Sequence, residues 1–330
     1  MIGGAIAFGL LFLTVGTIAL VLVAGPGGQG GGGGGGRVAP VIFKEKYVSG
    51  AGADKIAVLP VSGLIGPEDP GPIPLSTTGV SPETVRDQLR QAAEDERVKA
   101  VIFEVNSPGG GVVPTDQIHE NIREFKETTD KPVVVSMDAT AASGAYYIAT
   151  AADRIVANAN TLTGSLGVIF SYLNFEEAAD KLGLQEEVVK SGPYKDIGSS
   201  IREPTEEELE ILQTYVDEGY DRFVQVIVEG RDLPEEEVRE LADGRVYSGL
   251  QAESLGLVDE LGDLEKAAET SRELAGVEKA TVVRYQRPSP GLAELLGARL
   301  ASPEPEAEAL KVLKSVGLSP TPELQYLYRP

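Results

Sequence analysis

The chain has 330 residues, of which 42 % are hydrophobic, and can bury the core of one large or two modest domains. Its formal net charge of −22 argues against a nucleic-acid partner, because phosphate binding requires an excess of Lys and Arg. With no cysteine and one histidine, the sequence excludes cysteine nucleophiles, disulfides, structural zinc sites and multi-histidine metal centres, and we expect neither a metal nor a cofactor.

The N-terminal segment from Ile2 to Ala24 has no charged residue and is long enough to cross a bilayer. A cleaved signal peptide is the alternative. Against it, the apolar run is longer than a typical signal-peptide core, no charged region precedes it, and it ends in a poor cleavage site. We therefore predict an uncleaved transmembrane helix over residues 1–24, followed by a glycine-rich flexible linker over residues 25–54.

From residue 55 onward, strand and helix patterns alternate, which predicts an α/β fold with a parallel sheet and crossover helices. The expected strands are residues 56–61, 100–105, 133–137 and 154–157, and the expected helices are residues 81–94, 115–128 and 143–151. After residue 168 the pattern becomes mainly helical. The expected elements there are a helix over 175–182, a strand over 187–189, a loop over 191–199, a long helix from the capping box at 205–208 to about 229, helices near 235–242 and 250–255, and a βα unit ending at 285.

The chemistry is expected where two of these strands end. Residues 106–111 (NSPGGG) run from an apolar strand into a proline and three glycines, which leaves backbone N–H groups bare for an oxyanion. Residues 141–147 (AASGAYY) place Ser143 among small residues at a strand-to-helix turn. Ser143 is therefore the candidate nucleophile.

A serine nucleophile needs a base. The only histidine, His119, lies mid-helix among polar residues, where a solvated histidine on the helix face is expected. The sequence has neither Gly-x-Ser-x-Gly around Ser143 nor Ser-x-x-Lys anywhere. A lysine remains, and Lys195, in a Gly/Pro/Ser loop, is the best placed, although a solvated surface charge is the alternative for any single lysine. Keeping an unperturbed lysine neutral at pH 7 costs ~4.6 kcal/mol, so its surroundings must lower its pKa.

Five linked motifs resemble the signal peptide peptidase A family in order and spacing. They are residues 106–111 (NSPGGG), 141–147 (AASGAYY), 161–168 (TLTGSLGV), 191–198 (SGPYKDIG) and 243–249 (DGRVYSG) together with 252–261. The resemblance covers about residues 55–285 and implies a peptidase domain over residues 55–286. It also implies a parallel-sheet core of the Clp protease/crotonase type with a helical C-terminal extension, preceded by one transmembrane helix and followed by a tail over residues 287–330.

The resemblance also implies the roles of individual residues. Ser143 matches the nucleophile and Lys195 the general base of a serine–lysine dyad. Gly110 matches the oxyanion glycine, whose N–H acts together with that of Gly144. Ser165 matches a hydroxyl that helps to hold the lysine amine. In related proteins the dyad forms between neighbouring protomers, so a ring-like homo-oligomer, such as an octamer, is expected.

Three features depart from the family pattern. Ala145 stands where a second glycine is more usual, which narrows the pocket floor slightly. Asp196, beside the expected base, raises the pKa of that lysine unless its carboxylate points away. The first basic residues follow the N-terminal span and weakly favour a cytoplasmic body, but long domains translocate regardless of such charges. The resemblance implies an extracytoplasmic body, and on that basis we expect a single-pass protein of the cell membrane with an extracytoplasmic catalytic domain.

The favoured function is a membrane-anchored serine endopeptidase that degrades cleaved signal peptides and other membrane-derived peptides. One alternative is a crotonase-like acyl-CoA enzyme, which needs neither Ser143 nor Lys195, and another is a non-catalytic membrane scaffold. The tail adds a further hypothesis, because residues 324–328 alternate apolar groups that could lie in a neighbour's substrate groove or seal a rim. A disordered end is the alternative for this segment.

Overall fold

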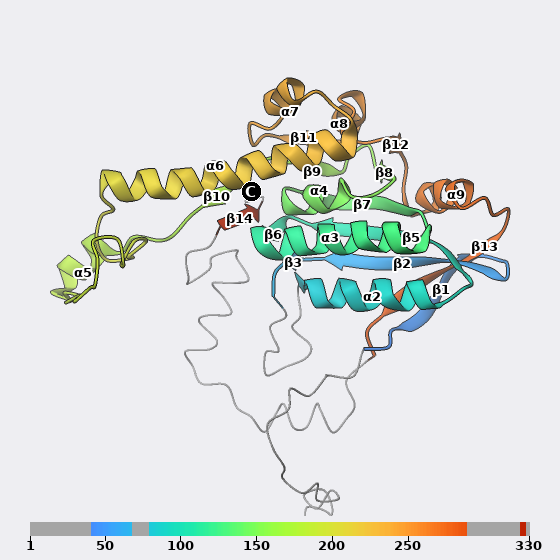
Figure 1. Ribbon diagram of the computed structural model, residues 1–330, viewed down its shortest axis with the longest axis horizontal. Helices are drawn as coiled ribbons and strands as arrows, with labels where there is room; N and C mark the ends of the chain where they lie inside the picture. The colour runs from blue at the N-terminus through green and yellow to red at the C-terminus, as the bar shows by residue number, and fades with distance from the viewer. Residues whose placement is uncertain (1–40, 68–78, 289–323, 328–330) are drawn as a thin grey trace, which may run out of the picture. The chain divides into compact units, whose positions relative to one another are not determined.

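The computed structural model describes residues 41–67, 79–288 and 324–327, which belong to a compact unit beginning at Val41 (Figure 1). Within these ranges, no helix combines the length and the apolar character needed to cross a membrane. The predicted transmembrane helix over residues 1–24 lies outside the described residues.

The central sheet is mostly parallel, as the alternating pattern predicts. Its strands run in the order β1-β13-β2-β5-β7-β8-β12. Their bounds are β1 (Lys44–Gly50), β2 (Asp54–Ser62), β5 (Val98–Ser107), β7 (Val133–Ala142), β8 (Arg154–Ala157), β12 (Glu260–Leu261) and β13 (Ala280–Gln286). Every pair along this order is parallel except β1 with β13.

Strand β1 begins the sheet inside the range that the sequence assigns to the linker. Its residues are mainly exposed, so it has no apolar alternation from which to predict a strand. It is held by antiparallel pairing with β13 and by the Lys55 ammonium, which lies 2.6 Å from Glu45 in β1 and 2.9 Å from Asp95.

Helices cover both faces of the sheet. Helices α2 (Pro82–Glu94), α3 (Val112–Thr129) and α4 (Gly144–Ala149) share one apolar core with alternate residues of the strands, and α9 (Leu264–Leu274) shares a second core with the intervening residues. In β5, for example, Phe103 belongs to the first core and Ile102 to the second. This division follows from the alternation of side chains across a strand.

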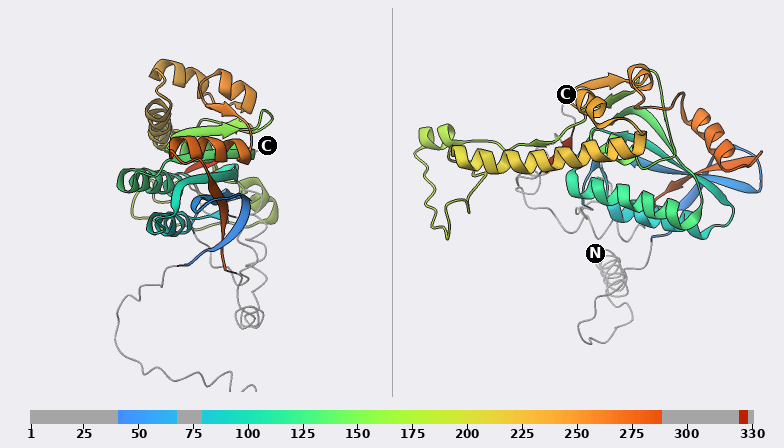
Figure 2. Two further views of the ribbon diagram at one scale, coloured as in Figure 1. Left: turned by 90° about the vertical axis from the view of Figure 1, so that its right-hand side faces the viewer. Right: turned by 45° about the horizontal axis from the view of Figure 1, so that its top comes forward.

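Helix α6 (Glu206–Arg231) links the core to an extension. It begins at a capping box formed by Thr205 and Glu208, as predicted, and its C-terminal half buries Phe223, Val224 and neighbouring apolar residues. Its N-terminal half continues beyond the sheet together with α5 (Glu176–Leu182) and the chain between them (Figures 1 and 2). We call residues 171–215 the arm.

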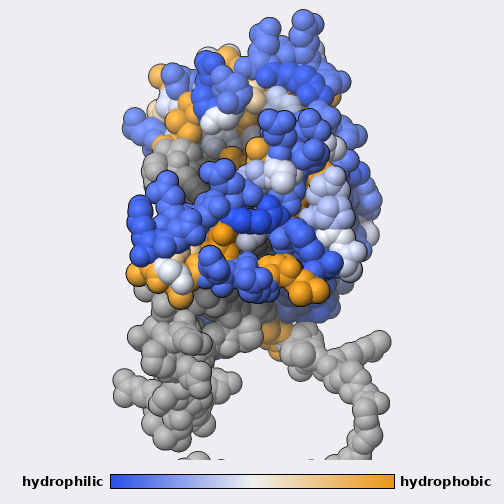
Figure 3. Space-filling view, turned by 90° about the vertical axis from the view of Figure 1, so that its left-hand side faces the viewer, coloured by the Kyte–Doolittle hydropathy of each residue, from blue (hydrophilic) through white to orange (hydrophobic). Residues whose placement is uncertain are grey.

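The arm exposes apolar side chains that the rest of the described chain mostly buries. These residues are Leu173, Phe175, Leu182, Leu184, Val188, Val189, Tyr194, Leu209, Ile211 and Tyr215. Apolar patches among hydrophilic residues are visible from the side of the molecule on which the arm lies (Figure 3). The strand predicted over residues 187–189 is wrong, because this segment is exposed and pairs with no neighbouring strand.

A small second sheet completes the part that positions the site. It has the order β10-β14-β6-β3-β4, with β10 (Ile169–Phe170), β14 (Leu324–Leu327), β6 (Gly109–Gly111), β3 (Leu64–Ile65) and β4 (Gly79–Val80). Helices α7 (Glu235–Leu241) and α8 (Gly249–Ser254) lie near their predicted positions. Strand β11 (Val246–Ser248) pairs with β9 (Leu162–Gly164), which also joins the end of β7.

Candidate active site

Ser143 occupies a strained turn between β7 and α4. Its backbone has φ 55 and ψ −119, a conformation that non-glycine residues rarely adopt and that recurs at functional sites. The side chain is 1 % exposed, and its Oγ has no hydrogen-bond partner among the described residues. The turn therefore holds a buried hydroxyl without a hydrogen-bond partner in the described part of the chain, in a backbone conformation that recurs at functional sites.

The glycine strand β6 lies beside this turn. Gly109 has φ 100, and a Cβ on it would stand 2.7 Å from the backbone nitrogen of Gly144. A Cβ on Gly110 would stand 1.9 Å from the carbonyl oxygen of Ile65 in β3. These close approaches require glycine. They set the glycine strand directly against the first residue of α4, with Gly109 next to Gly144 and the predicted oxyanion glycine Gly110 one position further along the strand.

The C-terminal strand β14 runs antiparallel to β6, with Tyr326 opposite Gly110. The carbonyl oxygen of Tyr326 lies 2.1 Å from the position of a Cβ on Gly109 and 3.1 Å from that of a Cβ on Gly144. This carbonyl is thus at the junction of the glycine strand and the turn at Ser143. The segment that the sequence offers to a neighbour's groove lies, in this structure, on the glycine strand of its own chain.

The Tyr326 side chain fills an aromatic pocket. It is fully buried, its ring stacks on Tyr147 at 5.0 Å between centroids, and it lies 4.8 Å from the ring of Phe223. Its hydroxyl donates to the carbonyl oxygen of Gly219 at 2.9 Å. The pocket is therefore apolar along its sides and has a hydrogen-bond acceptor at its end.

His119 lies behind this pocket, and the prediction that it is solvated is wrong. Its side chain is buried because α3 packs against α4, and its ring meets the Tyr147 ring edge-on at 5.2 Å. Its Nδ1 has no hydrogen-bond partner among the described residues and lies 3.6 Å from a Glu120 carboxylate oxygen. Burial lowers the pKa of His119. The hydroxyl of Tyr147 points to another partner and donates to Asp116 at 2.5 Å.

Ser165 follows β9, whose pairing with β7 places it next to the turn at Ser143. Ser165 is half-buried with φ 51, and its N–H donates to the carbonyl of Arg245 at 2.7 Å. The preceding residue, Gly164, accepts a 2.8 Å hydrogen bond from the N–H of Ser143. One chain thus brings together four of the predicted site residues, which are Gly110, Ser143, Gly144 and Ser165.

Lys195 is not among them. It belongs to the arm, between α5 and α6. This segment of the chain lies away from α4 (Figure 1). Its side chain is exposed and makes no hydrogen bond or ion pair within the described part of the chain. The predicted nucleophile and base therefore do not meet in a single chain.

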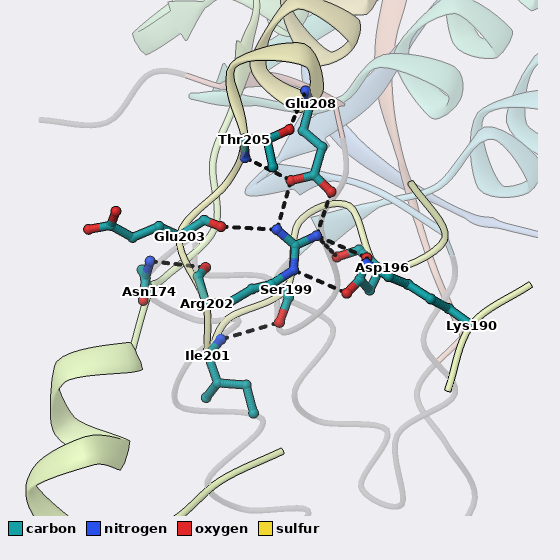
Figure 4. A network of polar contacts seen from close by, with 9 residues as sticks. All are labelled: Asn174, Lys190, Asp196, Ser199, Ile201, Arg202, Glu203, Thr205 and Glu208. Carbon is teal, nitrogen blue, oxygen red and sulfur yellow. Dashed lines mark hydrogen bonds and ion pairs between the residues drawn. The ribbon is translucent and has the colours of Figure 1, made fainter. Parts of the chain in front are cut away.

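The carboxylate of Asp196 is turned to other partners than its neighbour Lys195. It accepts from the Arg202 guanidinium, with Nη2 to Oδ1 at 2.9 Å, and from the Lys190 ammonium at 2.7 Å (Figure 4). These hydrogen bonds, Arg202 first, hold the pKa of Asp196 well below its usual range. Asp196 departs from the family pattern, but its negative charge is neutralised by Arg202 and Lys190.

Some residues of the site could not be found from the sequence. Tyr147 lies within the AASGAYY motif and Tyr326 within the alternating apolar tail, so a local signal existed for both, but Phe223 comes from a distant segment without one. Thr115 in α3 is also buried, has an unpartnered Oγ1 among the described residues, and lies 2.8 Å from the position of a Cβ on Gly144. Ala145 is fully buried in the core.

A serine in a strained strand-to-helix turn, beside a glycine strand on a mostly parallel α/β scaffold, defines the class of a serine hydrolase. Comparison with known proteins gives the family. The model of peptidase family S49 matches residues 125–278. The putative signal peptide peptidase SppA of Enterococcus faecium is 38 % identical over 294 residues, covering 87 % of this chain and 85 % of that protein.

Two further relatives agree. A putative protease of Synechocystis is 39 % identical over 228 residues, covering 68 % of this chain and 82 % of that protein. Protease 4 of Haemophilus influenzae is 36 % identical over 235 residues, covering 70 % of this chain and 36 % of that protein. The chain belongs to peptidase family S49 and is a serine peptidase, which confirms the family resemblance seen in the motifs.

Proposed function

We propose that this peptidase is a membrane-anchored endopeptidase that binds peptides in extended form and cleaves signal-peptide remnants and other membrane-derived fragments. The observation that carries the proposal is the pairing of β14 with β6. An extended segment of polypeptide lies antiparallel on Gly109–Gly111, with one side chain buried and one carbonyl beside the nucleophile turn. A substrate strand bound in the same way would gain main-chain hydrogen bonds and a side-chain pocket.

In this proposal Ser143 is the nucleophile and Lys195 the base. The neutral amine of Lys195 takes the hydroxyl proton as Oγ of Ser143 attacks the substrate carbonyl carbon. The proton then passes to the leaving amine as the peptide bond breaks. In the second half, the same amine takes a proton from the water that attacks the acyl-enzyme and returns it to Oγ of Ser143 as the ester bond breaks. The role of Ser165 is to hold the lysine amine near Oγ.

The developing oxyanion is proposed to accept hydrogen bonds from the N–H groups of Gly110 and Gly144. The place of the Tyr326 carbonyl, between the glycine strand and the nucleophile turn, supports this assignment. Loss of one such donor typically costs ~3–4 kcal/mol in transition-state stabilisation.

The base is proposed to come from a neighbouring copy of the chain. Lys195 is exposed on the arm, away from Ser143, and the arm carries the exposed apolar residues named above, which a second copy would cover. Repetition of this contact from copy to copy produces a closed ring, such as an octamer. The N-terminal segment would anchor the ring, with its catalytic domains outside the cytoplasm.

The test uses two inactive variants, Ser143→Ala and Lys195→Ala. Each alone should lose peptide cleavage while keeping its oligomeric size. When the two are co-assembled in equal amounts, sites that combine Ser143 of one copy with Lys195 of the next should restore about a quarter of the activity, as expected for random assembly in a ring. Unchanged peptide turnover in either single variant would contradict the proposed dyad. The acyl-CoA alternative needs neither Ser143 nor Lys195, so it predicts that neither substitution affects activity. If the co-assembled mixture does not cleave peptides, the proposal that two neighbouring copies share one active site is contradicted.

A further inference from the structure

The loop that carries Lys195 is a run of tight turns. The N–H of Lys195 donates to Gly192 at 3.3 Å, that of Ile197 to Tyr194 at 3.1 Å, and that of Ser199 to Asp196 at 3.0 Å. These bonds fix the backbone on both sides of Lys195 while its side chain stays exposed. They do not by themselves attach the loop to the rest of the arm.

Arg202 makes that attachment. Its guanidinium donates on one side to the carboxylate of Asp196, through Nε at 3.1 Å and Nη2 at 2.9 Å, and to the Asp196 carbonyl at 3.2 Å. On the other side it donates to both carboxylate oxygens of Glu208, with Nη1 to Oε2 at 2.7 Å (Figure 4). Such a planar fork is specific to arginine.

Glu208 is itself held firmly. It is 1 % exposed, and it accepts a 2.9 Å hydrogen bond from the N–H of Thr205, while its own N–H donates to the Thr205 hydroxyl at 3.2 Å. The hydrogen bonds from Arg202, followed by that from Thr205, lower the pKa of Glu208 to about 2. The anchor of the loop is thus the first turn of the long helix α6.

The charged groups around the Lys195 loop, apart from Lys195 itself, are two cations and two anions, so their charges sum to zero. The charged groups that face it are Lys190, Asp196, Arg202 and Glu208, and Glu203 offers Arg202 only its carbonyl oxygen. Asp196 is the nearest in sequence to Lys195, and its carboxylate is shared by Arg202 and Lys190. A carboxylate released from these partners would favour the charged form of the neighbouring amine.

We propose that Arg202 is a positioning residue for the base, which fixes the Lys195 loop on α6 and keeps the Asp196 carboxylate engaged away from the lysine amine. This inference rests on the proposed role of Lys195. Arg202 takes no part in the reaction itself. It has two separable effects on the Lys195 amine, one on its position and one on its protonation.

The test compares kcat as a function of pH in three proteins. In Arg202→Gln the acidic limb of the profile should move upward by about one pH unit, because Asp196 keeps only Lys190 as a partner. In Arg202→Gln combined with Asp196→Asn the limb should return to the wild-type position, since no carboxylate is left beside the amine. KM should change little in either. Arg239→Gln is the matched control, because Arg239 also bridges two carboxylates, those of Asp221 and Glu235, but outside the arm. It should leave the profile unchanged.

The outcomes separate this inference from the proposed function. If Lys195→Ala is inactive but Arg202→Gln lowers kcat equally at every pH, and the added Asp196→Asn substitution restores nothing, then Arg202 acts only on the placement of the loop, and the proposed effect on the protonation of Lys195 is overturned. If Arg202→Gln changes neither kcat nor its pH profile, both proposed effects are overturned. A fully active Lys195→Ala variant instead refutes the proposed base, whatever Arg202 does. Circular dichroism and sedimentation of each variant show that folding and assembly are retained.

Discussion

The backbone N–H of Ser143 donates to the carbonyl of Gly164 at 2.8 Å, and this bond ties the turn at Ser143 to the turn that carries Ser165. Gly164 has φ +79, and a Cβ on it would stand 2.5 Å from the ring of Tyr247 and 2.9 Å from the carbonyl of Arg245. Gly164 therefore cannot be replaced by a larger residue without strain, because its φ is positive and because no room exists for a Cβ.

Replacement of Gly164 by Ala should disturb both stability and catalysis. The positive φ costs about 1–2 kcal/mol in an alanine, and relief of the clash with Tyr247 adds about 1–3 kcal/mol. Gly276→Ala is the control, because Gly276 has φ +65 and no atom within 4 Å of its Cβ position, so it should lose only the first amount and keep full activity. Urea unfolding and peptide turnover measure the two effects, and equal losses in the two variants would show that the contact with Tyr247 is unimportant.

Much of the fold, and part of the site, follow from local pattern. The strand over residues 154–157 is confirmed with its bounds, and the capping box opens α6 as predicted, because apolar alternation and cap residues act over a few positions. The serine turn was also visible in sequence, since small residues follow a strand there. The roles given to the site residues stay predictions.

The sequence predictions that were wrong, and the features that were missed, depend on contacts with residues far away in the chain. His119 was expected to be solvated because its neighbours are polar, yet it lies with Ile118 and Ile122 on the buried face of α3. Strand β1 exists only because β13, far along the chain, pairs with it, whereas residues 187–189 have strand-forming side chains but no partner. The apolar alternation over residues 324–328 suggests an extended segment, but nothing in it shows that Tyr326 pairs with Gly110 of the same chain.

Substrates should be selected for tyrosine at the side chain that enters the Tyr326 pocket. The rings of Tyr147 and Phe223 favour an aromatic group, and the Gly219 carbonyl accepts a hydrogen bond from a hydroxyl. One such bond is worth about 1 kcal/mol, so kcat/KM should favour Tyr over Phe by about fivefold and over Asp by on the order of 100-fold. A series of peptides that differ at this one position measures the preference, and equal turnover of Tyr and Asp peptides would refute the assignment of the pocket.

Removal of the residues after Pro320 should uncover the glycine strand. The segment now paired with Gly109–Gly111 competes for the same backbone groups as a substrate, so its loss should lower KM several-fold with little change in kcat. A full-length Tyr326→Asp variant should behave similarly, because a carboxylate is disfavoured in the aromatic pocket. Initial rates at low peptide concentration provide the measurement, and identical KM values for the truncated and intact chains would count against competition at this edge.

His119 should make folding less favourable at acidic pH. Burial lowers its pKa below the ordinary value of 6.5, against the opposing influence of Glu120 and Asp116, so the unfolded chain binds a proton more readily than the folded one. Stability should therefore fall as pH drops below 6.5, by at most ~1.4 kcal/mol per pH unit, and this slope should disappear in His119→Gln. Because the chain has a single histidine, its ring resonances give the titration directly by NMR after labelling of histidine. A midpoint at or above 6.5 in the folded protein would mean that the nearby carboxylates, rather than burial behind Tyr147, control this side chain.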